Sequence, residues 1–183
     1  MRVTFPRLPD RERSYALVER DDGAVYRLYG GPASPRLPHD IMHFVVEREL
    51  STPDGIWAGL ASGIVSGSMQ QLLRAEVLAD LVECVAALDH PSDTQIRSLT
   101  ATRLSVLPDA DVDPAAVAAA ATALQVEASR WARLRVGQEL IYDWPRGPLA
   151  PRRSRAGGPR AVRIYKKRAR GGRDGRHATR PPR

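Results

Sequence analysis

The chain of 183 residues contains one cysteine, Cys84, so it can form no internal disulfide bond. Cys84 lies in an apolar run, and we interpret it as a buried thiol in a reducing compartment. The amino terminus has no apolar segment of signal-peptide length, and no stretch approaches the roughly 18 apolar residues that a membrane span requires. These absences predict a cytoplasmic protein without a transmembrane segment.

Sequence signals for the common reaction classes are also missing. No glycine-rich phosphate loop stands between a strand and a helix, no Gly-x-Ser-x-Gly nucleophile motif occurs, and no cysteine pair has the spacing of zinc ligands. The sequence therefore names no reaction, and it leaves open whether the protein is an enzyme.

The net charge of +7 is divided unevenly along the chain. Residues 1–145 carry 14 Lys and Arg against 20 Asp and Glu, a balance of −6, whereas residues 146–183 carry 14 against Asp174 alone, a balance of +13. Residues 146–183 are rich in Arg, Gly and Pro and contain few core-forming side chains. We therefore expect a single globular domain over residues 1–145 and a disordered basic tail over residues 146–183.

The basic tail suggests one class of function. Its composition resembles the Arg/Gly tails that contact nucleic-acid backbones, with an aromatic ring available for stacking. Such tails also bind acidic proteins or anionic lipid, and others only keep a protein soluble. One hypothesis is therefore an adaptor whose helical body is structural and whose tail binds nucleic acid or an acidic protein in a salt-dependent way. The contact residues would be Tyr165, Lys166, Lys167, Arg168 and Arg170.

Two strand-like runs near the amino terminus flank Asp21-Asp22-Gly23, a turn sequence. We predict a β-hairpin within residues 1–30, with Val3–Phe5 as a further strand. Residues 36–135 have helical periodicity and capping signals, and residues 136–145 fit a strand that returns to the hairpin. The predicted fold class is α+β, mainly α, with four or five helices packed on a small antiparallel sheet. The expected helices span residues 38–50, 56–66, 70–88, 92–104 and 114–134.

Glycine recurs at every fourth position from Gly55 to Gly67, which would leave one face of the expected helix over residues 56–66 almost bare. Glycine in a helix interior costs up to about 1 kcal/mol relative to alanine, so we expect a compensating close contact. We interpret the stripe as a groove for another helix. A flat ligand or the tail of a substrate is the alternative.

The expected helix over residues 38–50 carries two of the four histidines one turn apart. A polar arc opposite an apolar stripe is typical of a solvated helix face. The alternative is a divalent-metal site, because histidines at i and i+4 point the same way and can share one ion. His39 and His43 would be ligands, with Asp40 as a ligand or as an acceptor that orients a ring. If this site exists, the acidic stripe Glu76, Asp80 and Glu83 on the expected helix over residues 70–88 can supply a remote carboxylate.

His39-Asp40-x-x-His43 opens a helix and is followed by an acid about a dozen residues later. This pattern, over about twenty residues, resembles the zinc motif of the accessory proteins of coenzyme Q biosynthesis, a mostly helical family. Where that family places its glutamate this chain has Gly55, and the resemblance makes Asp54, one position earlier, the candidate third ligand. The longer string Leu-Pro-His-Asp-x-x-His-Phe-Val-Val-Glu also resembles an uncharacterised family of small high-GC bacterial proteins, which implies no activity.

The leading hypothesis from these patterns is a small metal-binding protein. It would hold a divalent ion, zinc first, through His39, Asp40, His43 and Asp54, and would serve as an accessory factor or an enzyme acting on a small apolar molecule.

Overall fold

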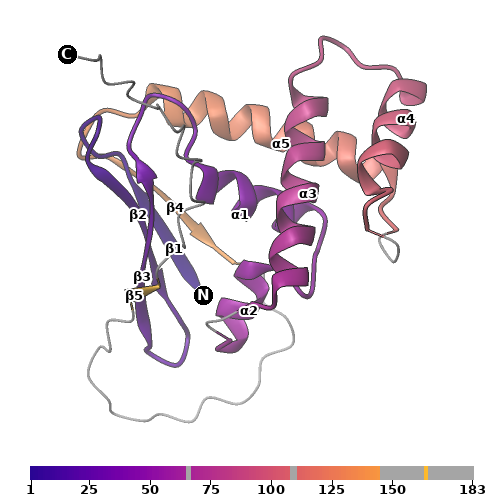
Figure 1. The fold of residues 1–183 in the computed structure, drawn as a ribbon. Coiled ribbons are helices and arrows are strands. Elements are labelled where there is room, and N and C mark those ends of the chain that lie inside the picture. The colour runs from indigo at the N-terminus through magenta and orange to yellow at the C-terminus, as the bar shows by residue number, and fades with distance from the viewer. Residues whose placement is uncertain (65–66, 108–110, 145–162, 165–183) are drawn as a thin grey trace, which may run out of the picture.

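A computed structural model describes residues 1–64, 67–107, 111–144 and 163–164 of the chain (Figure 1). Within these residues the chain forms five helices and a five-stranded sheet. The elements, in order, are β1 (Arg2–Pro6), β2 (Arg13–Glu19), β3 (Val25–Pro32), α1 (His39–Glu49), α2 (Ile56–Ser62), α3 (Met69–Ala86), α4 (Asp93–Leu104), α5 (Pro114–Arg133), β4 (Glu139–Asp143) and β5 (Arg163–Ile164).

The sheet has the strand order β4-β1-β2-β3-β5, and the pairs β4–β1, β1–β2 and β2–β3 are antiparallel. β2 and β3 form the predicted hairpin around Gly23, whose φ of 83° glycine adopts at little cost. β4 pairs with β1 from Arg2↔Asp143 to Pro6↔Glu139. The predicted return of the late strand to the amino-terminal strands is therefore confirmed, and so is the mainly helical α+β class.

The predicted tail over residues 146–183 lies almost wholly outside the described residues. The exception is β5, in which Arg163 and Ile164 pair in parallel with Arg27 and Leu28 of β3. The predicted nucleic-acid contacts Tyr165, Lys166, Lys167, Arg168 and Arg170 fall outside the described part of the chain.

Side-chain caps mark the start of three helices, and α4 and α5 begin within one residue of the starts expected from the sequence. Ser68 and Ser92 each accept a hydrogen bond from the third residue of the following helix, and a glutamine there bonds back to the serine N–H. Asp113 caps α5, and Pro114 occupies its first turn. Of the helices in the described ranges, none is both long enough and apolar enough to cross a membrane.

The core lies between the sheet and the helices, which Figure 1 shows gathered on one side of the sheet. Val3 and Phe5 of β1 and Ala16 and Val18 of β2 alternate with more exposed residues and are buried, as expected for strands with one face in a core. Phe44 of α1 packs at the centre of an aromatic cluster. Its ring centroid lies 5.0–5.8 Å from the rings of Phe5, Trp57, Tyr142 and Trp144.

The glycine stripe does not form the single groove that the sequence predicts. α2 ends at Ser62, because Gly63 takes a φ of 94° and closes the helix. A β-carbon at Gly55 would meet the Glu47 carboxylate, whereas one at Gly63 would meet the Arg20 guanidinium. The glycines therefore allow separate close contacts with different elements, and the prediction of one helix-packing face is wrong.

Candidate metal centre

α1 begins directly after Pro38, whose extended backbone leads the chain into the helix at His39. Proline loses no hydrogen bond here, because the first N–H groups of a helix have no partner within it. His39 and His43 are one turn apart, so their rings lie on the same side of α1. Phe44 and Val45 are fully buried in the core, which sets the rotation of the helix and hence the direction of the histidines.

The polar arc of α1 differs from the solvated face of an ordinary surface helix. His43 is 2% exposed and Glu47 is 1% exposed, so the solvated-face interpretation is wrong for these two residues. His39 is exposed and Asp40 is half-buried. Burying a polar side chain without a hydrogen-bond partner costs roughly 1–3 kcal/mol, so the partners of the two buried residues matter.

Glu76 of α3 contacts both histidines. Its Oε2 lies 3.1 Å from Nε2 of His39 and 3.5 Å from Nε2 of His43, and the two Nε2 atoms are 2.9 Å apart. The rings are nearly perpendicular, with centroids 4.4 Å apart. Three atoms that can bind a metal therefore meet from two helices, and His39, His43 and Glu76 are the residues of the described part of the chain that are grouped in this way. We call them the His-His-Glu group.

The acidic stripe of α3 divides between different partners. Glu76 faces the histidines, whereas Asp80 pairs with Arg103 of α4 at 2.9 Å and Glu83 is exposed. Arg103 also donates a hydrogen bond to Sγ of Cys84 at 3.2 Å, and this thiol is half-buried rather than fully buried as predicted. Helical spacing identifies the stripe, but only the packing of α3 against α1 selects Glu76 from it.

The other predicted ligands, Asp40 and Asp54, do not join the His-His-Glu group. A β-carbon at Gly30 would lie 2.5 Å from Oδ2 of Asp40, which puts that carboxylate against the backbone of β3. Asp54 pairs with Arg74 of α3 at 3.6 Å. The acidic member of the group thus comes from α3 and not from the segment that follows α1.

Glu47 caps the next helix. Its carboxylate accepts hydrogen bonds from the backbone N–H groups of Ile56 at 3.0 Å and Trp57 at 2.8 Å, which have no partners within α2. Burial raises the pKa of Glu47 to about 7, and these hydrogen bonds oppose the rise. The same carboxylate explains Gly55, because a β-carbon at that position would overlap Oε2 of Glu47.

Replacing Gly55 by alanine is expected to destabilise the protein by about 1–3 kcal/mol, because the added methyl group collides with a carboxylate held by two hydrogen bonds. The backbone itself suits alanine, since φ is −71° and ψ is 169°. Chemical denaturation measures the change. Gly31→Ala is the matched control, because a β-carbon at Gly31 meets nothing within 4 Å; equal effects of the two substitutions would contradict the overlap.

Exposed apolar side chains precede Glu76 on α3. Met69, Leu72 and Leu73 are 82%, 37% and 50% exposed. The buried arc of α3 begins only at Ala75. Residues three, four and seven positions apart share one side of a helix. The solvent side of the His-His-Glu group therefore continues into an apolar stripe.

Comparison of the chain with protein-family models, with curated proteins and with solved structures gives no match. The function is therefore argued from the chemistry of the site.

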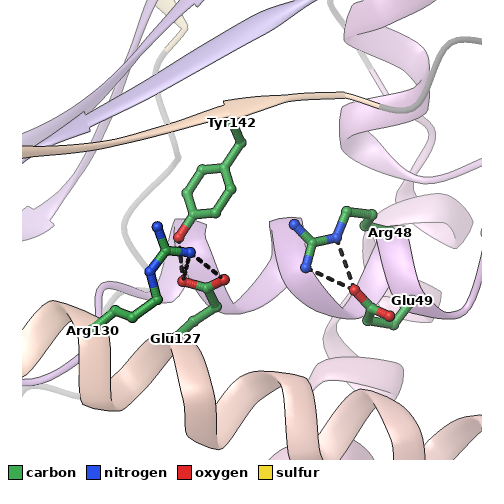
Figure 2. Close-up of polar contacts among 5 residues, drawn as sticks. All are labelled: Arg48, Glu49, Glu127, Arg130 and Tyr142. Carbon is green, nitrogen blue, oxygen red and sulfur yellow. Dashed lines mark hydrogen bonds and ion pairs between the residues drawn. The ribbon is translucent and has the colours of Figure 1, made fainter.

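A second buried carboxylate, Glu127 of α5, is fully engaged within the protein (Figure 2). Tyr142 of β4 donates its hydroxyl to Oε2 at 2.6 Å, and Arg130 donates to both oxygens at 2.9 and 3.1 Å. Burial, followed by the bond to Glu127, raises the pKa of Tyr142. Arg48 lies over the Tyr142 ring and pairs with Glu49 at 2.7 Å. Each charge has an opposite partner, so this cluster joins α5 to β4 and we assign it no ligand.

Proposed function

We propose that the protein binds one divalent metal ion, with zinc as the first candidate, through Nε2 of His39, Nε2 of His43 and Oε2 of Glu76. The convergence of these three atoms from two helices is the observation that supports it. The side chain of His43 is 3% exposed, whereas those of His39 and Glu76 are 46% and 50% exposed. The group is therefore buried on the side of His43 and open to solvent on the side of His39 and Glu76, where an ion can enter.

The separations between the three atoms suit zinc. A tetrahedral ion with bonds of about 2.0–2.1 Å holds its ligand atoms about 3.3 Å apart. The separations in the His-His-Glu group are 2.9, 3.1 and 3.5 Å, which bracket that value. Small side-chain movements therefore suffice to admit the ion.

The donor set also indicates how the ion would be used. Two histidines and one carboxylate are a zinc donor set of catalytic sites, which keep a fourth position open for water or substrate. An ion bound there supplies a Lewis acid and lowers the pKa of its water. The exposed sides of His39 and Glu76 leave room for that position on the solvent side of the group.

The neighbouring surface supports a small apolar molecule as the partner of the ion. Met69, Leu72 and Leu73 lie on the side of α3 that leads to Glu76, and all are exposed. A molecule with an apolar body and a polar end can cover these side chains while its polar end reaches the open position. This arrangement supports an accessory factor or an enzyme acting on such a molecule.

Metal analysis of the full chain, purified without chelators, tests the proposal. We expect the purified protein to contain about one equivalent of zinc, iron or manganese. After the metal has been removed, titration with zinc should restore one equivalent of bound metal. His39→Gln and Glu76→Gln should each weaken zinc binding by at least about 10- to 100-fold, which is the cost of losing a partner that only orients a ligand, because each removes an atom that would bind the ion directly.

Matched controls are available for both ligands. His90→Gln removes a histidine whose side chain is 97% exposed, and Glu83→Gln removes an exposed acid from the same helix as Glu76. Neither should change zinc affinity. If the wild-type protein holds no stoichiometric metal and binds none tightly on addition, the proposal fails, and the group is only a hydrogen-bonded cluster.

A further inference from the structure

β4 is an edge strand of the sheet. It pairs with β1 on one side, and within the described ranges no strand pairs with its other side, whereas the far side of β3 is paired with β5. The pairing with β1 keeps one register over all five residues of β4. A regular edge strand presents a row of unpaired backbone N–H and C=O groups to which another extended chain can bind. We call this side of the strand the open edge of β4.

The hydrogen bonds to β1 determine which backbone groups of β4 face the open edge. Trp144 donates its N–H to the carbonyl of Met1 at 2.8 Å, and Arg7 donates its N–H to the carbonyl of Gln138 at 2.8 Å. In an antiparallel ladder, residues that bond to one neighbour alternate with residues whose backbone groups point the other way. The even-numbered residues of β4 therefore bond to β1, and the odd-numbered residues face the open edge.

The odd-numbered residues of β4 are Glu139, Ile141 and Asp143. Their side chains are all exposed, because strand side chains alternate and Tyr142 points toward α5 (Figure 2). Ile141 is 51% exposed between the two carboxylates. The open edge thus combines unpaired backbone groups with an acid–apolar–acid row of side chains.

The two carboxylates determine which partner fits. Side chains directly opposite each other in an antiparallel pair are neighbours, so opposite charges stabilise the pair and like charges destabilise it. A second copy that paired through β4 about Ile141 would set Glu139 against Asp143 twice, so these charges oppose self-association. Asp143 lies 4.0 Å from Arg2, with side chains 79% and 61% exposed, and such a surface pair contributes little stability. The complementary partner has a basic side chain opposite each acid and an apolar one between them.

We infer that the open edge of β4 binds an extended basic segment of another protein, which adds to the sheet as an antiparallel strand. Lysine or arginine would lie opposite Glu139 and Asp143, and an apolar side chain would lie opposite Ile141. The inference does not depend on the metal site, which lies between α1 and α3. It also differs from the adaptor hypothesis, in which the body is purely structural and the tail makes the contact.

Heteronuclear NMR titration of the full chain with the peptide Thr-Lys-Thr-Val-Thr-Lys-Thr tests the inference. The largest shifts are expected at the amides of Glu139, Ile141 and Asp143. Hydrogen exchange at these amides should slow at least about tenfold when the peptide is saturating, because each gains a hydrogen bond. The same peptide with glutamate in place of both lysines should bind at least about tenfold more weakly, since both cross-strand charge pairs become repulsive.

N-methylation of the peptide tests the backbone contact separately from the charges. In the proposed alignment the valine and the lysines direct their N–H groups to β4, whereas the threonine N–H groups point away. N-methylation of the valine should lower affinity at least about tenfold, because it removes a donor and adds a methyl group at the contact. N-methylation of a threonine beside it should leave affinity within about threefold.

Charge reversal in the protein completes the test. Glu139→Lys with Asp143→Lys should make the glutamate peptide bind better than the lysine peptide. The matched control is Glu83→Lys with Asp89→Lys, which makes the same change of net charge at exposed positions elsewhere and should keep the wild-type preference. Circular dichroism verifies that each variant is folded.

Four outcomes would overturn the inference. They are unperturbed amides at the three odd-numbered positions of β4, equal effects of the two N-methylations, and an unchanged peptide preference in the folded charge-reversed variant. The fourth is a dimer in sedimentation equilibrium whose odd-numbered β4 amides are protected without peptide, which would assign the open edge to a second copy of the chain.

Discussion

Replacing Phe44 by alanine is expected to lower the free energy of unfolding by about 3–5 kcal/mol, a large part of the roughly 5–15 kcal/mol that stabilises a typical domain. Phe44 is fully buried, and its ring touches aromatic side chains from β1, α2, β4 and the residue after β4. Edge-to-face aromatic pairs add to the area that each ring buries. Truncation would leave a cavity where the helices meet the sheet.

Urea denaturation of the full chain measures this effect. Val136→Ala is the control, because Val136 is 58% exposed and its truncation should change stability by no more than about 0.5 kcal/mol. Phe44→Leu should fall between the two, since it keeps most of the apolar volume. A loss below about 1 kcal/mol for Phe44→Ala would show that the aromatic cluster does not hold the helices to the sheet.

The stability of the protein is expected to fall as pH rises from about 4.5 to about 7, through the titration of Glu47. Burial raises the pKa of Glu47 from its ordinary value of 4.5 to about 7 in the folded state. Between these values the folded protein holds a proton that the unfolded chain has released, so the stabilising contribution is complete below pH 4.5 and is lost as pH approaches 7. The loss is about 3 kcal/mol, at about 1.4 kcal/mol per pH unit.

The test compares the pH profile of wild-type stability with that of Glu47→Gln. The amide does not titrate, so the difference between the two proteins should change by about 3 kcal/mol between pH 4.5 and 7 and then level off. Using a difference removes the contributions of other titrating groups common to both proteins. Glu139→Gln, at an exposed position of β4, should follow the wild-type profile. Parallel profiles for wild type and Glu47→Gln would contradict the role of Glu47.

Local sequence signals predicted the elements of the fold well where a helix or turn depends on its own residues. Ser92 and Asp113 cap the helices expected over residues 92–104 and 114–134, and the strand near residue 140 returns to β1 as expected. The prediction that the glycine stripe forms one helix-packing groove was wrong, because the contacts of each glycine depend on residues that are distant in sequence. Gly63 ends α2 and lies against Arg20, the residue after β2, a contact that helical spacing cannot indicate.

In the candidate site, too, some features follow from the sequence and others from the tertiary structure. The spacing of His39 and His43 was determined by the sequence alone, because a helix repeats every 3.6 residues wherever it lies in the fold. The choice of Glu76 as their acidic neighbour, the burial of Glu47 against α2 and the space that Gly55 leaves for it were decided by the tertiary structure. The physical reason is that helix periodicity determines which side chains share a face, whereas only the packing of one helix against another determines what that face meets.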